Sequence, residues 1–377
     1  KWDRAMTIVN ASREALGELI DLLQEVDQRW AGEEWNLHSN EDIAGAHRAL
    51  MHLLDGGIGT MFENDPSAPL MRRIVTPTRK FTGDNSDAIY FDAPVSADYE
   101  YRLRGNMHGA VYVSVTLEEG TAGGGLGTKT AGIINDTQFE VDAAGNFEIW
   151  LGGPARDNNW LALTPDTSRI TTRHYFEEVA SASADPAREP VFEIEVLNRT
   201  QAPAVPDEHS VAAGIRRVGE FVRSRTIGMP PMAETAASVP FLSIEPNQFP
   251  APVPPGDMGL AAIDAAYSMA PYYLGPDEAL VITGRWPDCR MGNVCLWTRF
   301  QQTYDYCNRQ VSLNRAQTRL QADGSFRMVL AHQDPGCDNW IDTEGRALGI
   351  VFWRFFLPEG DIETPQAEVV KFDQLTA

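Results

Sequence analysis

Apolar residues near the start of the chain recur at the spacing of an α-helix. Between residues 3 and 30 they lie three or four positions apart, so they share one helical face. A second helix is predicted over 40–54, with Asn40 as its N-cap and Gly56-Gly57 as its stop. We expect the two helices to pack together as a hairpin.

From residue 73 onward the pattern changes to short runs of β-branched and aromatic residues, separated by turn residues. Such runs are typical of an antiparallel sandwich. The glycine-rich stretch 118–128 predicts a mobile loop. The predicted strands are 88–91, 99–103, 110–116, 132–134, 139–141, 147–151, 190–197, 279–283, 294–300, 326–330 and 348–356.

The β-rich regions are separated by a segment of different character. A helix is predicted over 209–224, and the stretch 229–258 then contains eight prolines. So many prolines are incompatible with a helix or a central strand, which indicates an extended connection. A short helix is predicted over 259–269, before the second β-rich region.

Several short patterns occur twice, in the same order. Gly105 stands 40 residues before Gly145, and Gly284 stands 40 residues before Gly324. A repeat of this length predicts two related domains and is far too long for a solenoid. The other repeated pairs are Asp142-Ala-Ala-Gly-Asn-Phe147 with Asp323-Gly-Ser-Phe326, Asn159-Trp160 with Asn339-Trp340, and Arg173 with Arg354.

These patterns predict a mainly β protein. It would consist of two jelly-roll-like antiparallel β-sandwiches, with an N-terminal helical hairpin and short helices between the two copies. The expected units are a helical segment at 1–72, a first sandwich at 73–205, a helix and Pro-rich connection at 206–258, and a second sandwich at 259–377.

The repeated residues resemble those of a known family, the bacterial family catalogued as domain of unknown function 1214. The resemblance covers most of the chain beyond about residue 76 and is clearest in Asp323-Gly-Ser-Phe326 and Asn339-Trp340. It implies jelly-roll β-sandwiches and no particular reaction. The chain departs from the family's Asn-Trp-Leu-Pro run, because Ala162 and Asp342 occupy the last position.

Charge, hydropathy and cysteine content bear on the partners and the location of the protein. The net charge of −22, from 53 acidic and 31 basic residues, would repel a phosphate backbone, so nucleic acid is not expected as a partner. No stretch is apolar for long enough to span a bilayer. The four cysteines lack zinc-site spacing and fit either two disulfides, with an extracytoplasmic location, or four thiols in the cytoplasm.

The densest polar cluster in the sequence is 80–92. Asp84 and Asp87 are the candidate acid and base, with Lys80 and Asn85 binding substrate beside them. The same carboxylates could accept Ca²⁺, the one cofactor considered, although no metal ligands are assigned. The alternative is an ordinary turn whose side chains bond their own backbone. The second copy lacks this cluster, as expected of a site gained by one copy.

Arginine and aromatic side chains supply the remaining candidates for substrate binding. Arg102 and Arg104 share a strand face and, with Arg173, could hold an anionic group. Ion pairing with the many carboxylates is the alternative. Three aromatic residues, Tyr90, Trp160 and Tyr175, are candidates for stacking on a ligand, with core packing as the alternative.

The predicted function is that of a non-redox enzyme, of hydrolase or lyase type. It would act on a glycan or another polyhydroxylated or anionic organic molecule by carboxylate acid/base chemistry. The alternative is a non-catalytic binding protein for a small hydrophobic or sugar ligand. Either way the expected partner is a small molecule or glycan, and self-association into a homo-oligomer stays open.

Overall fold

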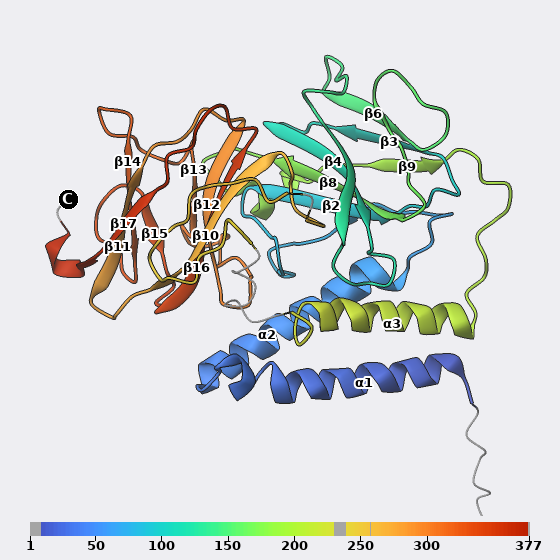
Figure 1. Ribbon diagram of the computed structural model, residues 1–377, viewed down its shortest axis with the longest axis horizontal. Coiled ribbons are helices and arrows are strands. Elements are labelled where there is room, and N and C mark those ends of the chain that lie inside the picture. Colours follow the sequence, from blue (N-terminus) through green and yellow to red (C-terminus); the bar gives the residue numbers. More distant parts are fainter. Residues whose placement is uncertain (1–8, 230–238, 257, 376–377) are drawn as a thin grey trace, which may run out of the picture.

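The protein is mainly β, with a helical layer at one side. The computed structural model describes residues 9–229, 239–256 and 258–375. Figure 1 shows the two β-sandwiches side by side, with three helices packed together below the first. The predicted fold class, two β-sandwich domains with an N-terminal helical hairpin, is confirmed.

The hairpin consists of α1 (Ala11–Arg29) and α2 (Asn40–Gly57). The side chain of Asn10 caps α1 by accepting hydrogen bonds from the amides of Ser12 and Arg13. Ser39 caps α2 in the same way, so the prediction of Asn40 as N-cap is off by one residue.

Gly56 and Gly57 do not end the second helix as predicted. Both lie within it, and the chain continues into a π-helical turn, η2 (Ile58–Phe62). A Cβ on Gly56 would lie 2.5 Å from the ring of Phe81. Glycine is therefore required here by close packing and not by a change of backbone direction.

The third helix, α3 (Glu208–Ser224), matches the helix predicted over 209–224. It packs along α1 and against α2, so the segment between the copies joins the N-terminal hairpin in one layer (Figure 1). None of the described helices is long and apolar enough to cross a membrane.

The first sandwich consists of a five-stranded and a four-stranded sheet. Its sheets have the orders β1-β2-β8-β4-β5 and β7-β6-β3-β9. All described pairs are antiparallel except β6 with β7. The strands are β1 (Arg72–Arg73), β2 (Ala88–Pro94), β3 (Tyr101–Asn106), β4 (Tyr112–Glu119), β5 (Lys129–Asn135), β6 (Asn146–Leu151), β7 (Trp160–Leu161), β8 (Thr167–Tyr175) and β9 (Glu193–Val196).

The second sandwich has the same strand order as the first. Its sheets are β10-β16-β12-β13 and β15-β14-β11-β17, which correspond one by one to β2-β8-β4-β5 and β7-β6-β3-β9. The strands are β10 (Ala265–Tyr273), β11 (Glu278–Gly284), β12 (Met291–Trp297), β13 (Ser312–Asn314), β14 (Phe326–Ala331), β15 (Trp340–Asp342), β16 (Leu348–Phe356) and β17 (Gln366–Lys371).

The first glycine of each repeated pair, Gly105 or Gly284, makes a packing contact with a phenylalanine. Gly105 lies opposite Phe147 in the β3–β6 pair, and Gly284 lies opposite Phe326 in the β11–β14 pair. A Cβ on Gly105 would lie 2.5 Å from the Phe147 ring, and one on Gly284 would lie 2.9 Å from the Phe326 ring. Each phenylalanine ring therefore covers a glycine on the neighbouring strand.

Two predicted elements are wrong. The stretch 259–269 is not a helix, because residues from Ala265 onward form β10. This strand is buried on both faces, so it lacks the alternation that identifies a half-buried strand. The stretch 139–141 is not a strand; Phe139 is buried there against the ring of Phe147. Each of the other predicted strands overlaps an observed one.

The glycine-rich loop, which was predicted to be mobile, makes close contacts with two other parts of the protein. It packs against α3, where a Cβ on Gly124 would lie 2.1 Å from the carbonyl oxygen of Arg217. Gly124 also has a φ of +97°, which disfavours other residues. The same loop also contacts the segment that precedes β10, because a Cβ on Gly259 would lie 2.3 Å from Gly127.

Gly124→Ala is expected to lower the free energy of unfolding by about 1–3 kcal/mol, because the new methyl group must displace the loop from α3. Gly123→Ala is the matched control, since its Cβ would meet nothing within 4 Å. Urea unfolding of both variants measures the difference. Equal stabilities would contradict the close packing of this loop.

Candidate functional site

The predicted catalytic residues lie between the two sandwiches. Asp84 and Asp87 are only 2% and 1% exposed. The Asp84 carboxylate accepts a hydrogen bond from the amide of Thr303 at 3.1 Å and another from its hydroxyl. Asp87 accepts from Asn293 at 2.8 Å and from Asn314 at 3.1 Å. Every one of these donors belongs to the second sandwich.

Their neighbours make the same kind of contact. Lys80 is buried and donates to the carbonyl oxygen of Tyr304 at 2.6 Å. Asn85 accepts from Asn293 at 2.6 Å, and Ser86 bonds to Ser312 at 2.7 Å. The segment 80–87 is therefore a polar joint between the sandwiches.

The alternation of β12 explains why polar side chains meet this joint. Val294 and Leu296 point into the core of the second sandwich. Asn293 and Cys295, at the intervening positions, therefore point to the opposite face, toward segment 80–87. Both faces of the strand are covered, and all of its residues are buried.

Burial changes the ionisation of both carboxyl groups. It raises the pKa of Asp84 and of Asp87 to about 6, although hydrogen bonds from Thr303 and Asn293 oppose the shift. Lys80, which faces Asp84, has its pKa lowered by the same burial. A raised carboxyl pKa suits a proton donor, but these groups lack exposure to solvent.

The free energy of unfolding is expected to fall as pH rises from about 4 to above 6. The folded pKa of Asp84 and Asp87, about 6, lies above the unfolded value of 3.8, so the folded state binds more protons in this range. The double variant Asp84→Asn/Asp87→Asn should reduce the fall, by on the order of 1–3 kcal/mol per carboxyl. Urea titrations at pH 5 and pH 7.5 test this. An unchanged slope in the variant would contradict the assignment.

The three arginines predicted to bind an anion do not lie together. Arg102 and Arg104 lie on β3, where Arg102 pairs with Glu195 at 2.5 Å and Arg104 with Glu148 at 2.7 Å. Arg173 lies on β8, in the other sheet, and is buried. Its guanidinium contacts Glu118 at 3.4 Å. Ion pairing, the alternative weighed above, accounts for all three.

The candidate aromatic residues are engaged within the protein. Tyr90 and Tyr175 are buried, and the Tyr175 ring packs 4.0 Å from Phe356 of the second sandwich. Trp160 is half-buried and donates its indole N–H to the carbonyl oxygen of Gly152 at 2.8 Å. Trp340 makes the equivalent bond in the second sandwich.

Among the described residues, the cysteines and acidic side chains form no cluster of three that could hold a metal ion. The four cysteines, which all lie within the described residues, form no disulfide with one another. Within the described ranges, no three His, Cys, Asp or Glu side chains lie close enough to hold a metal ion.

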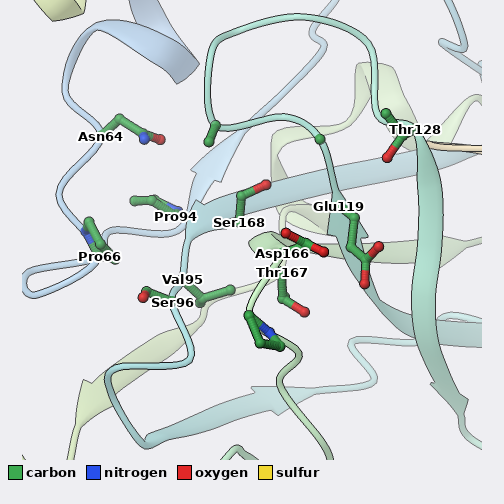
Figure 2. A pocket seen from close by; sticks show the side chains of 13 residues that line it. Asn64, Pro66, Pro94, Val95, Ser96, Glu119, Thr128, Asp166, Thr167 and Ser168 are labelled. Carbon is green, nitrogen blue, oxygen red and sulfur yellow. The ribbon is translucent and has the colours of Figure 1, made fainter.

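A groove at one end of the first sandwich offers accessible polar groups (Figure 2). Its volume is about 520 Å³, within the range of small-ligand sites. It lies where β2 and β4 end and β8 begins, beside the segment that follows η2. Its lining residues are Asn64, Pro66, Pro94, Val95, Ser96, Glu119, Gly120, Ala122, Thr128, Pro165, Asp166, Thr167 and Ser168.

The lining combines hydrogen-bond donors and acceptors but contains no Lys, Arg or His. The exposed Asp166 carboxylate and Thr128 hydroxyl have no hydrogen-bond partner among the described residues. Glu119 accepts from Thr164 at 2.7 Å and pairs with Lys129 at 3.2 Å, and the Thr164 bond is the main cause of its lowered pKa.

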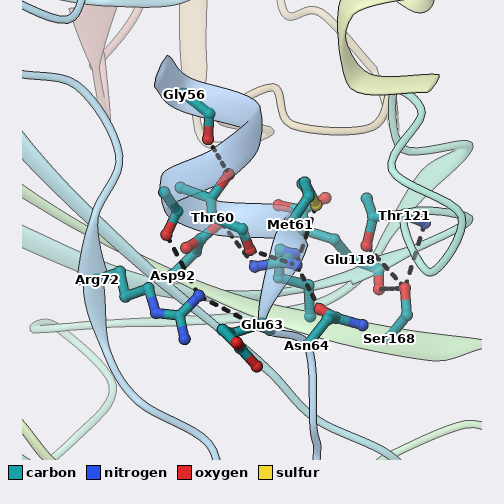
Figure 3. Close-up of polar contacts among 12 residues, drawn as sticks. Gly56, Thr60, Met61, Glu63, Asn64, Arg72, Asp92, Glu118, Thr121 and Ser168 are labelled. Atoms are coloured by element: carbon teal, nitrogen blue, oxygen red, sulfur yellow. Dashed lines mark hydrogen bonds and ion pairs between the residues drawn. The ribbon is translucent and has the colours of Figure 1, made fainter. Parts of the chain in front are cut away.

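A buried ion pair supports one wall of the groove (Figure 3). Arg169 bonds to Asp92 at 2.9 Å, and both are buried. The same guanidinium donates to the side-chain oxygen of Asn64 at 2.7 Å and to the carbonyl oxygen of Thr60 at 3.3 Å. It thus satisfies a carbonyl group at the end of η2 and fixes a residue that lines the groove.

A second groove of about 520 Å³ lies on the second sandwich, lined among others by Glu278, His332, Gln333 and Lys371. Its lysine is already paired, since Lys371 bonds to Glu278 at 3.2 Å and to Asp277 at 3.0 Å. His332 contacts Thr343 at 2.6 Å.

None of the residues that line the first groove was predicted as a site residue, because no motif in the sequence identifies them. The groove is formed by chain segments that are distant in sequence, around residues 64, 94, 119 and 166. The one available signal was the glycine-rich stretch 118–128, which forms part of its rim.

Comparisons with known proteins identify solved structures of the same fold and indicate no activity. No family model matches the chain, and no curated protein matches it. An uncharacterized protein from Burkholderia cenocepacia has a similar crystal structure, with a TM-score of 0.83 and 26% identity, over 97% of this chain and 98% of that one. A protein from Vibrio parahaemolyticus shares the fold, with a TM-score of 0.50 and 12% identity, over 86% of this chain and 100% of that one. The two-sandwich arrangement is thus found in solved structures.

Proposed function

We propose that this protein binds a small, uncharged, polyhydroxylated ligand, such as a sugar, in the groove of the first sandwich. The observation that supports the proposal most directly is the groove's set of accessible polar groups. This corresponds to the sugar-binding alternative considered from the sequence. The ligand site is distinct from the segment that carries Asp84 and Asp87.

The lining suits hydroxyl groups because each hydroxyl both donates and accepts hydrogen bonds. The Asp166 carboxylate is an acceptor, the Asn64 amide offers a donor, and the Thr128 hydroxyl can act as either. The rings of Pro66 and Pro165 provide small apolar surfaces for the C–H groups of a sugar.

Charge argues against an anionic ligand in this groove. Two carboxylates, Glu119 and Asp166, line it, and no lining side chain is cationic. Glu119 is paired with Lys129, so a bound carboxylate or phosphate would lie beside the like charge of Asp166. The groove also lacks the aromatic side chains typical of sites for large apolar ligands.

A thermal-shift screen with glucose, galactose, mannose, maltose and inositol tests the proposal, because a bound ligand raises the apparent melting temperature. We expect at least one sugar to raise it in the wild type but not in Asp166→Ala/Thr128→Val. Gln333→Ala, in the second groove, is the control and should respond like the wild type. A response lost in the control and kept in the groove variant would refute the assignment.

Acid/base catalysis by Asp84 and Asp87 is a second candidate function. Their raised pKa, about 6, favours it. Substrate would reach them only if the sandwiches moved apart, since both are buried at the joint. Should a substrate be found, full turnover by Asp84→Asn and Asp87→Asn would exclude this role.

We also propose that the two sandwiches arose by duplication and that the chain is a relative of the family catalogued as domain of unknown function 1214. The matching strand orders and the two glycine–phenylalanine contacts support the duplication. The resemblance to the family rests on the repeated motifs alone. Sequences of closer relatives of each half test both statements: they should resemble one another, and they should resemble members of that family.

A further inference from the structure

We propose that Arg169 is a positioning residue for the groove: it holds the Asn64 side chain so that the amide N–H groups face the bound ligand. The inference rests on the proposed sugar-binding function. It adds a specific requirement, namely that the ligand place a hydrogen-bond acceptor beside Asn64.

The chemistry of arginine fixes which end of the Asn64 amide faces the groove. A guanidinium group can only donate hydrogen bonds, so the atom 2.7 Å from Arg169 must be the amide oxygen, Oδ1. The other polar atom, Nδ2, has no hydrogen-bond partner among the described residues. In Figure 2 the Asn64 side chain points toward the strand ends that carry Ser168.

Arg169 is itself held in a single orientation. The residue is 2% exposed, and its guanidinium bonds to Asp92 at 2.9 Å and to the carbonyl oxygen of Thr60 at 3.3 Å. Rotation to release Asn64 would break a buried ion pair. The Asn64 donor is thus ordered before a ligand binds, which reduces the entropy lost on binding.

Ser168, the neighbour of Arg169 on β8, has a different role. Neighbouring strand residues point to opposite faces, so Ser168 points away from the ion pair. It bonds to the hydroxyl of Thr121 at 2.7 Å and so ties the start of the glycine-rich loop to β8 (Figure 3). Its bonding capacity is largely used, whereas the donor on Asn64 is free for a ligand.

The substitution Asn64→Asp tests the hydrogen-bond donor of this side chain. Aspartate keeps an oxygen toward Arg169 but has no N–H group, so the melting temperature should be unchanged or higher. We expect the affinity for the sugar that binds the wild type to fall by about fivefold or more, as measured by calorimetry. Asn158→Asp, at an exposed asparagine outside the groove, is the matched control and should bind like the wild type.

Arg169→Lys tests the positioning itself. Lysine can pair with Asp92, but it lacks the planar fork that reaches Asn64 at the same time. Affinity should therefore fall although Asn64 is still present. If the wild type binds a sugar and both variants bind it equally well, the positioning role is overturned and the binding function stands. If the wild type binds none of the sugars, both are overturned.

Discussion

Replacing Arg169 by methionine is expected to lower the free energy of unfolding by about 3–5 kcal/mol. The reason is that Asp92 would remain buried, at 4% exposure, without the cation that compensates its charge. Burial already raises the pKa of Asp92, and Arg169 is the main group opposing that shift. Urea unfolding followed by tryptophan fluorescence measures the loss.

The matched control is Arg102→Met, which removes an ion pair of the same chemistry from the surface. Arg102 and Glu195 are partly exposed, so their pair should contribute only about 0–1 kcal/mol. The double variant Arg169→Met/Asp92→Leu should recover part of the lost stability, because it removes the uncompensated carboxylate. Equal losses for Arg169→Met and Arg102→Met would contradict the structure of this pair.

The second large effect is expected at the glycine–phenylalanine contacts. Phe326→Ala should cost about 3–5 kcal/mol, because the Phe326 ring is 1% exposed and fills the core of the second sandwich. Phe147→Ala should have a similar cost in the first sandwich.

A double-mutant cycle tests the contact itself. Gly284→Ala alone should destabilise the protein by about 1–3 kcal/mol, since the new methyl group would meet the Phe326 ring. In the Phe326→Ala background the same change should cost much less, because the ring is absent. Additive costs would show that the glycine is not required by the ring.

Much of the fold could be predicted because it depends on local patterns. Capping residues and periodic apolar positions located α1 and α2, runs of β-branched and aromatic residues located most strands, and the repeated motifs indicated two related domains. The helix predicted over 259–269 failed because β10 is buried on both faces. A strand in that environment shows no alternation, and its alanines and methionine favour a helix in isolation.

The candidate site was less predictable, because residue type does not reveal the surroundings of a side chain. The stretch 80–92 was predicted as a site because it is the densest polar cluster and because the second copy lacks it. The structure suggests a different reason for that asymmetry: this segment meets Asn293, Asn314 and Thr303 of the second sandwich. The contact joins different surfaces of the two copies, so the residues that form it in the first copy are not expected to recur in the second. The catalytic role of Asp84 and Asp87 stays a prediction.

The groove residues escaped prediction for a related reason. Asn64, Thr128 and Asp166 are ordinary loop residues, and they become a candidate site only because the fold brings three distant segments together. Arg169 was not predicted as a site residue either, and β8 itself is absent from the predicted strands. Its importance depends on two contacts, Asp92 and Asn64, that no sequence spacing indicates.

Calorimetric titration of one sugar from the screen into three proteins tests the central claim most directly. The proteins are the wild type, Asp166→Ala/Thr128→Val in the groove, and Asp84→Asn/Asp87→Asn at the joint. We predict binding by the wild type and by the joint variant with similar affinity, and a loss of about tenfold or more in the groove variant. Loss of binding in the joint variant, with the groove variant unaffected, would contradict the account.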